Sequence, residues 1–279
     1  MHEHHVIFLS PCGSTRAAAW TVAGELARLG AACRTTDLSP ILRGQAALPA
    51  FPPGACLWIG SPVYCDHALP QVMDCITGLP PGEGRFAVPF VTWGGVCSGT
   101  ALAEMGRALA RKGYALLGAA KVMAEHSSLW RYPEPIGKGR PDEADLKLLR
   151  ELAASVLARS AGLETGQGGP LDPAALDYQP ERNKAKAVAS SLAAAKRHAA
   201  SLDADEARCI SCELCVDICP VGARRMDPLP VAGETCILCK SCARCCPEGA
   251  INADTTGFLE RLRAVSEECG EARETRIFL

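Results

Sequence analysis

The sequence predicts an α/β domain with a doubly wound parallel sheet, followed by a smaller cysteine-rich domain. Two observations carry this prediction. Over residues 1–160, short apolar runs alternate with segments of helical periodicity, which is typical of strands joined by helical crossovers. Beyond residue 203, cysteines gather in two copies of one spacing, which is typical of a small domain built around metal.

The strands and helices of the first domain follow in order along the chain. Short apolar runs bounded by glycine, proline or polar residues predict strands at 6–10, 55–62, 85–95 and 114–123. Helical periodicity predicts helices at 15–30, just after Leu69, at 101–113 and at 141–160. We therefore expect residues 1–160 to form one domain.

The middle of the chain changes composition twice. Residues 161–180 are rich in glycine and proline, which predicts a linker. Residues 181–202 predict one basic helix, with apolar positions on one face. This helix either packs on a domain by its narrow apolar stripe, or it offers a docking face to an acidic partner. Residues 203–255 form the predicted cysteine-rich domain, and 256–279 a C-terminal helix and tail.

Charge and cysteine content narrow the class of protein. The 279 residues carry a formal net charge of −2, which argues against a nucleic-acid partner. No apolar stretch approaches the roughly 20 residues of a membrane span, and no secretory signal is recognised. We therefore expect a soluble cytoplasmic protein, in which thiols stay reduced. Sixteen cysteines then indicate metal rather than disulfides.

The cysteine-rich domain contains the spacing C-x2-C-x2-C-x3-C-P twice. The two runs read CISCELCVDICP, which begins at Cys209, and CILCKSCARCCP, which begins at Cys236. This is the bacterial iron–sulfur run, in which three cysteines hold one cluster and the fourth crosses to the other. A zinc ribbon is the alternative, but it needs neither the third cysteine nor the C-P pair.

The crossing rule predicts two ligand sets for two [4Fe–4S] clusters. Cluster I is predicted to use Cys209, Cys212, Cys215 and Cys246. Cluster II is predicted to use Cys236, Cys239, Cys242 and Cys219. Cys245 is then spare, because Pro247 directly follows Cys246 as Pro220 follows Cys219. These motifs resemble the two-cluster bacterial ferredoxins over about residues 203–253, and Cys245 departs from that pattern.

The loop after the first predicted strand indicates an anion site. The segment SPCGSTR opens a helix, and its glycine allows a close backbone approach while the helix N-terminus offers unpaired N–H groups. Its candidate residues are Ser10, Cys12, Gly13, Ser14 and Thr15. No Walker lysine follows, so a monophosphate fits better than a nucleoside triphosphate.

Two further loops leave the same edge of the sheet, because ligands of doubly wound sheets sit at the carboxyl ends of strands. The predicted strand at 55–62 leads into Pro62, Val63 and Tyr64, and the predicted strand at 85–95 ends in Trp93, Gly94 and Gly95. Tyr64 and Trp93 are candidates to cover the two faces of a flat ring. Glu125 and His126, after the predicted strand at 114–123, lie either near that ring or in a surface loop.

These three loops, in this order, resemble those of a flavodoxin over about residues 5–160. The resemblance implies that the first loop holds an FMN phosphate and the other two hold the flavin ring, although Cys12 replaces a usual hydroxyl residue. The whole chain resembles the flavodoxin-domain-containing ferredoxins of anaerobic microbes. It implies an electron carrier that relays electrons between FMN, two clusters and a protein redox partner, and a homodimer is an open possibility.

Two other functions remain open at this stage. In the first, the clusters feed FMN, which reduces a small substrate, with His126 or Tyr64 as proton donor. In the second, the chain is a ferredoxin whose flavodoxin-like domain is an empty docking module. The absence of a dinucleotide fingerprint argues against a hydride donor in all three.

Overall fold

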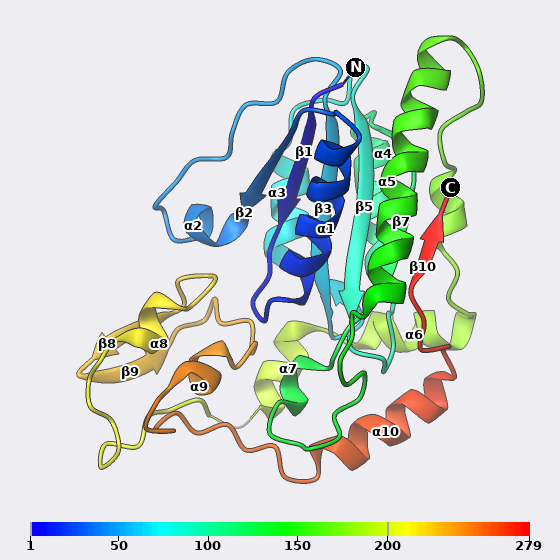
Figure 1. The fold of residues 1–279 in the computed structure, drawn as a ribbon. Helices are drawn as coiled ribbons and strands as arrows, with labels where there is room; N and C mark the ends of the chain where they lie inside the picture. The colour runs from blue at the N-terminus through cyan, green and yellow to red at the C-terminus, as the bar shows by residue number, and fades with distance from the viewer. Residues whose placement is uncertain (1, 200) are drawn as a thin grey trace.

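The computed structural model describes residues 2–199 and 201–279. It contains a large α/β domain and a small lobe of short helices and strands, which lies below one end of the sheet (Figure 1). The helix α10 (Phe258–Cys269) runs beneath the sheet and returns the chain to the large domain.

The large domain is built on a mostly parallel sheet. Its strands lie in the order β10-β7-β5-β3-β1-β2, and those from β7 to β2 pair in parallel. Their bounds are His4–Phe8 (β1), Cys33–Asp37 (β2), Cys56–Tyr64 (β3), Phe86–Trp93 (β5) and Ala119–Met123 (β7). Numbered along the chain, this order is 2-1-3-4-5, which is the flavodoxin-like doubly wound order. The predicted fold class is confirmed.

Helices cover both faces of this sheet. On one face, α1 (Ser14–Arg28) and α5 (Glu143–Glu164) bury their apolar sides against the strands. On the other face lie α3 (Pro70–Gly78) and α4 (Ala101–Arg111), and α2 (Leu38–Leu42) follows β2 at the edge. The helices expected within residues 1–160 are present, with ends shifted by a few residues.

The strand predicted over 114–123 is divided into two. Strand β6 (Ala115–Leu116) pairs with the start of β5, and β7 pairs further along it. The register advances by one residue between them, from Ala87 opposite Leu116 to Phe90 opposite Ala120. One extra residue on one strand is a bulge, which bends the strand locally.

The helix predicted over 181–202 is wrong as a single element. The structure has α6 (Glu181–Ala189) and α7 (Leu192–His198), separated by extended backbone at Ser190 and Ser191. Ser191 caps the second helix by accepting a hydrogen bond from the Ala194 N–H at 3.0 Å. His67 Nε2 meets the carbonyls of Ala187 and Ser190 at 2.8 and 3.0 Å, so the last carbonyls of α6 have a partner outside the helix.

The segment between α5 and α6 packs closely on the large domain. Its 3₁₀ turn at Pro173–Leu176 places Leu176 in the core beneath α4, and Leu171 N–H donates to the Leu116 carbonyl at 2.7 Å. The C-terminal tail also joins this domain, because β10 (Arg276–Phe278) pairs antiparallel with β7. Neither contact is visible in the composition of these segments.

The small lobe is an α+β unit. It contains α8 (Leu214–Asp217), the hairpin of β8 (Arg224–Asp227) and β9 (Leu229–Ala232), and α9 (Ser241–Cys245). A bridge between Ala204 and Ile251 joins its two ends. Among the helices in the described part of the chain, none is both long and apolar enough to cross a membrane.

Candidate cofactor sites

The loop before α1 is shaped around the helix N-terminus. Gly13 has φ 98°, a left-handed conformation that L side chains rarely adopt, and it lets the chain turn sharply into the helix. Ser10 Oγ accepts a hydrogen bond from the Arg16 N–H at 2.9 Å. Thr15 is buried, and its hydroxyl lies 2.8 Å from that of Thr92 on β5. The N–H groups of Ser14 and Thr15, which have no acceptor within the helix, are oriented to bind an anion.

The loop after β3 is a tight turn. Tyr64 pairs with His67 of β4 (His67–Ala68), so Cys65 and Asp66 form a two-residue connection. Both residues have positive φ, 50° and 68°, as a type I′ hairpin requires, although such turns favour Asn-Gly. Non-glycine residues in this conformation store strain, and such strain is common where a loop meets a ligand.

The loop after β5 packs closely on the segment after β7. A Cβ on Gly94 would lie 2.7 Å from the His126 ring, so only glycine fits there. The Gly95 carbonyl accepts hydrogen bonds from Ser266 and Arg273, and Gly95 does not line the cavity described next. The Trp93 side chain is almost fully buried beside Lys121, whose Nζ lies 4.9 Å from the ring centre.

The three loops surround one cavity of about 590 Å³, within the range of small-molecule sites. It is lined by nine of the residues predicted to hold a flavin, namely Ser10, Cys12, Ser14, Thr15, Pro62, Val63, Tyr64, Trp93 and Gly94. Gly13 and Gly95 are not among the lining residues and shape the turns behind it. The structure thus brings the three predicted loops together at one edge of the sheet.

Two buried polar atoms of this region lack a partner. Within the described residues, Trp93 Nε1 and His126 Nδ1 have no hydrogen bond. Buried polar atoms are normally paired, so an unpaired atom beside a cavity favours a polar ligand there. Together with the anion-binding helix end, these atoms fit a ligand with a phosphate at one end and a polar ring at the other.

Burial weakens both candidate proton donors, His126 and Tyr64. Burial lowers the pKa of His126 to about 4, so its imidazole is neutral at neutral pH. Burial raises the pKa of Tyr64 well above its usual range, with smaller contributions from Cys12 and Cys239. Neither group is a ready source of protons for a bound substrate.

Sequence reasoning missed the far wall of this cavity. It comes from α7, from α10 and from the second cysteine motif, with Leu192, Ala195, Phe258, Arg261, Leu238 and Lys240 among its lining residues. The apolar stripe on residues 181–202 was the available signal, because Leu192, Ala195, Ala199 and Leu202 all line the cavity. Val188, on the same predicted stripe, is instead exposed, because the helix breaks between it and Leu192.

The predicted cluster cysteines gather in two groups. One small cavity is lined by Cys209, Cys212, Cys215 and Cys246. A second is lined by Cys236, Cys239, Cys242 and Cys219. Each group contains three cysteines from one motif and the fourth from the other, as the crossing rule requires. Cys245 lines neither cavity, and its Sγ lies 3.3 Å from the Cys242 carbonyl.

The two motifs repeat one backbone shape. The second and fourth residues after the first cysteine have left-handed φ in both copies, at Ser211 and Glu213 and at Leu238 and Lys240. The fourth cysteine of each motif also accepts the same kind of hydrogen bond, from the backbone N–H four residues later. Cys219 Sγ accepts the Ala223 N–H and Cys246 Sγ accepts the Ala250 N–H, both at 3.2 Å. Such N–H donors lower the energy of anionic sulfur, so the thiols present fit iron–sulfur ligation.

The second motif contacts the loop that precedes α1. Ser241 Oγ donates to the Pro11 carbonyl at 2.7 Å, and Cys12 Sγ lies 3.6 Å from the Cys239 carbonyl. Ile237, Cys239, Val221 and Ala223 belong to the same apolar core as the large domain. The group of Cys236, Cys239, Cys242 and Cys219 therefore lies next to the large cavity.

Comparison with known proteins assigns part of this architecture. Residues 203–225 match the family model for a 4Fe-4S binding domain. Rubredoxin oxygen:oxidoreductase from the anaerobe Desulfovibrio gigas has 18% identity and a TM-score of 0.44, over 58% of this chain and 37% of that one. A flavodoxin from the Archaea has 15% identity and a TM-score of 0.41, over 57% of this chain and 99% of that one.

Each of these matches covers only part of the chain. No curated protein matches the chain, and the chain spans little more than a third of the length of the Desulfovibrio gigas protein. The family match and the strand order together establish a flavodoxin-like domain joined to an iron–sulfur domain. Iron–sulfur clusters carry single electrons, so the chain has an electron-transfer role.

Proposed function

We propose that the chain relays electrons between FMN in the large cavity, two [4Fe–4S] clusters and a protein redox partner. One observation carries the proposal. The cavity is walled on one side by the three loops of the flavodoxin-like domain and on the other by Leu238 and Lys240 of the second cysteine motif. A cofactor in this cavity would lie directly beside the neighbouring thiol group.

The contacts favour one order of centres. Cluster II, on Cys236, Cys239, Cys242 and Cys219, would lie next to the FMN because Cys12 and Ser241 join the two sites. Cluster I, on Cys209, Cys212, Cys215 and Cys246, would lie further out, where Cys212 is exposed. Electrons would then pass between FMN and the surface through cluster II and cluster I in turn.

Flavin exchanges two electrons and each cubane carries one, so the two kinds of centre together convert paired electrons to single ones. The residues of the chain would position and insulate them. The N–H groups and hydroxyl of Ser14 and Thr15 would hold the phosphate, and Tyr64 would pack on the ring. Lys240 extends from between two cluster II cysteines into the cavity wall, where a cation favours negative charge on either cofactor.

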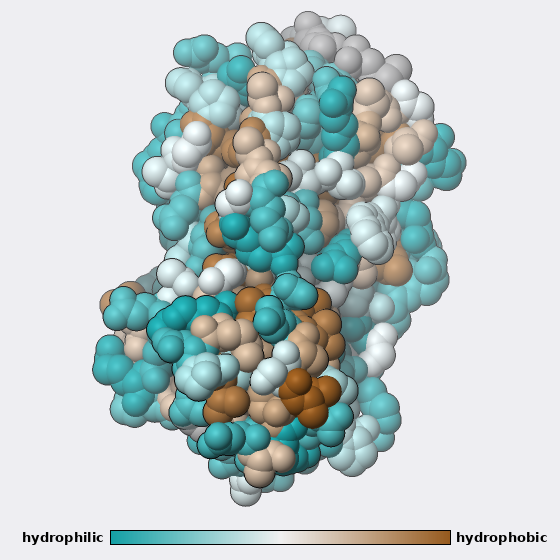
Figure 2. Space-filling model, turned by 90° about the vertical axis from the view of Figure 1, so that its left-hand side faces the viewer, coloured by the Kyte–Doolittle hydropathy of each residue, from teal (hydrophilic) through white to brown (hydrophobic). Residues whose placement is uncertain are grey.

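An apolar face at cluster I offers a place for the partner to dock. Ile210, Leu214 and Ile218 are exposed by 62%, 43% and 47%, and all three lie in the first motif. Hydrophobic side chains also gather on the face of the small lobe seen in Figure 2. Acidic residues outnumber basic ones around this motif, with Asp203, Asp205, Glu206, Glu213 and Asp217 against Arg208. A partner with an apolar patch and a basic rim fits this face.

The alternative of a flavin-dependent reductase has less support. Such an enzyme needs a proton donor beside its substrate, but burial makes His126 neutral at neutral pH and makes the Tyr64 hydroxyl a weaker acid. Leu238 and Lys240 of the second cysteine motif line the cavity, and this favours electron transfer between FMN and cluster II instead.

Anaerobic purification followed by iron, sulfide and flavin analysis tests the proposal. We expect about eight irons and eight sulfides per chain, as two cubanes supply, and one FMN that stays bound or rebinds on titration. About four irons, zinc in place of iron, or failure to bind FMN would contradict it.

A change at Ser14 tests the flavin part by itself. Ser14→Ala removes a hydroxyl at the anion site and should weaken FMN binding by about 1–2 kcal/mol, the scale of one charge-assisted hydrogen bond. Thr21→Val is a matched control, because Thr21 lies on the same helix and donates to the Ala17 carbonyl at 2.9 Å, outside the cavity. Equal affinities of the two variants on fluorescence titration would contradict the phosphate assignment.

A further inference from the structure

Two thiols outside the cluster motifs lie together where α10 ends. Cys97 follows β5 and lines the large cavity, whereas Cys269 is the buried last residue of α10. Cys97 Sγ, Cys269 Sγ and a Glu271 carboxylate oxygen all lie within 4.8 Å of one another. Neither thiol has a role in the relay proposed above.

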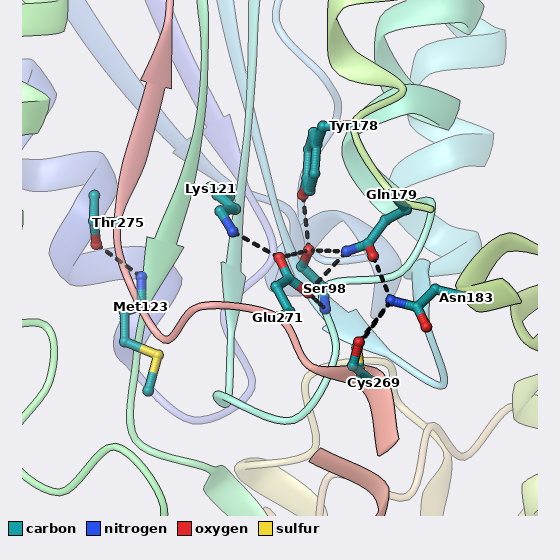
Figure 3. A network of polar contacts seen from close by, with 9 residues as sticks. All are labelled: Ser98, Lys121, Met123, Tyr178, Gln179, Asn183, Cys269, Glu271 and Thr275. Atoms are coloured by element: carbon teal, nitrogen blue, oxygen red, sulfur yellow. Dashed lines mark hydrogen bonds and ion pairs between the residues drawn. The ribbon is translucent and has the colours of Figure 1, made fainter. Parts of the chain in front are cut away.

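Glu271 has no free lone pair for a metal. Its Oε1 accepts from Lys121 Nζ and Ser98 Oγ, both at 2.6 Å, and its Oε2 accepts from Ser98 N–H and Gln179 Nε2, both at 2.8 Å (Figure 3). Four donors saturate a carboxylate. This arrangement leaves the two sulfur atoms as the reactive pair of the cluster.

The same network holds both cysteines in place. Ser98, the neighbour of Cys97, is tied to Glu271 through its N–H and its hydroxyl. Asn183 Nδ2 donates to the Cys269 carbonyl and to Cys269 Sγ, both at 3.2 Å, and Gln179 holds Asn183 through a further hydrogen bond (Figure 3). Two thiols held close by their surroundings are arranged to react with each other.

Each sulfur has a polar neighbour suited to disulfide chemistry. The Asp66 carboxyl interacts electrostatically with the Cys97 thiol, and burial raises the pKa of Asp66, which makes its carboxylate a better proton acceptor. The Asn183 amide stabilises negative charge on Cys269 Sγ. Burial raises the pKa of the Cys97 thiol, so an adjacent base is needed for it to react.

We propose that Cys97 and Cys269 form a reversible disulfide that links the loop after β5 to α10. Cys97 passes its proton to Asp66 and attacks one sulfur of a small-molecule disulfide, which releases one small thiol. Cys269 then attacks the Cys97 sulfur of the mixed disulfide, and the Cys269 proton leaves on the second small thiol. In sum, two protein thiols lose two electrons and two protons, and the small disulfide becomes two thiols.

This bond would change the cavity that the relay uses. Both Cys97 and α10 contribute to the cavity wall, so a covalent bond between Cys97 and Cys269 would restrict the opening of this wall. The large distance in sequence between the two cysteines also means that the bond would constrain a long segment of the unfolded chain. Oxidation is therefore expected to raise the temperature of unfolding. The proposal requires neither cofactor to be bound.

The test uses the complete protein, purified anaerobically and equilibrated with mixtures of oxidised and reduced glutathione. Acid quenching, alkylation with N-ethylmaleimide and mass spectrometry then measure the fraction of peptide linked through Cys97 and Cys269. We expect this fraction to rise and fall reversibly with the glutathione ratio. We expect the transition temperature to rise with it in the unaltered protein, but not in Cys97→Ser.

Variants separate a reactive pair from a structural one. Cys65→Ser, which removes another thiol of the same cavity wall, should leave the linked fraction unchanged. Asp66→Asn should slow its formation at least several-fold while the final ratio stays the same. A folded protein without the linked peptide at any glutathione ratio would overturn the proposal. So would zinc or iron beyond the clusters that is lost in both Cys97→Ser and Cys269→Ser, because these sulfurs would then be metal ligands.

Discussion

The two cysteine motifs have the same spacing and the same backbone, yet they meet different surroundings. The residue after the first cysteine is isoleucine in both. Ile237, in the second motif, is 1% exposed and packs in the core shared with the flavodoxin-like domain. Ile210, at the equivalent place in the first motif, is 62% exposed. The second motif packs against the large domain, whereas the first motif is exposed to solvent at this position.

This difference makes the two ends of the small lobe unequal. The repeated cysteine spacing makes the two ends of such a domain alike, so the spacing does not indicate which end contacts the large domain. The contacts of Ser241 with Pro11 and of Arg43 with the Asp217 carbonyl set how the lobe lies against the large domain. They place the second motif at the cavity and leave Ile210, Leu214 and Ile218 of the first motif exposed. Which of the two thiol groups lies at the cavity is thus a property of packing.

The largest effect is expected from removing a crossing ligand. Cys246→Ala takes the fourth thiol from the group around Cys209 and should lose or convert cluster I, while cluster II stays. Cys245→Ala should keep both, because Cys245 lines neither small cavity. Iron content and reduced-state EPR under anaerobic conditions measure the outcome. Loss of a cluster in Cys245→Ala would show that the two ligand sets are assigned wrongly.

The matched isoleucines test the contrast in packing. Ile237→Ala should lower the free energy of unfolding by about 2–5 kcal/mol, because it opens a cavity in a shared core. Ile210→Ala should change it by no more than about 0.5 kcal/mol, because the side chain is already in water. Anaerobic denaturant titration compares the two. Similar losses of stability would mean that the first motif is also buried in solution, for instance by a second copy of the chain.

A buried arginine links the two cluster sites electrostatically. Arg224 is 5% exposed, and its guanidinium donates to the carbonyls of Pro230 and Leu202 at 2.9 and 2.7 Å. It interacts electrostatically with Cys215 of one motif and Cys242 of the other. A buried cation favours the more negative, reduced state of a cluster.

Arg224→Met should therefore lower the reduction potentials of both clusters. Arg225→Met is the matched control, because Arg225 is exposed and pairs only with Asp227 at 3.2 Å among the described acidic residues. Arg224→Lys should restore most of the shift if charge is its cause. Potentials measured by anaerobic EPR titration that do not differ between Arg224→Met and Arg225→Met would refute the electrostatic role.

The smallest effect concerns the break between α6 and α7. The hydrogen bond to Glu104, at 2.6 Å, raises the pKa of His67 to about 9, and the carbonyls of Ala187 and Ser190 add to it. A folded-state pKa above the unfolded value means that the stabilisation is complete below about pH 6.5 and is lost as pH rises through 9. Because the pair is partly exposed, we expect about 1 kcal/mol.

Unfolding transitions from pH 6 to pH 10, with His67→Gln beside the unaltered protein, measure this contribution. The stability difference between the two should shrink as pH rises. His198→Gln, at an exposed position, controls for titration of histidine in general. A pH-independent difference would mean that His67 acts through packing rather than charge.

Local patterns in the sequence predicted most helices and strands of the large domain. Alternating apolar runs and helical periods predicted the parallel sheet, since each strand and helix must bury one face. The doubled cysteine spacing predicted the two thiol groups, because the reach of a short loop is set by its covalent length. The loops around Ser10, Tyr64 and Gly94 were found because strand ends of a parallel sheet meet at one edge.

Only the tertiary structure shows which distant segments contact these helices, strands and loops. The break at Ser190 depends on His67, more than a hundred residues earlier, and the bulge before β7 depends on its pairing with β5. The cavity wall from α7 and α10, and the meeting of Cys97 with Cys269, come from segments whose local patterns are unremarkable. Such contacts join residues far apart in sequence, and no short-range periodicity encodes which distant surface will cover a given face.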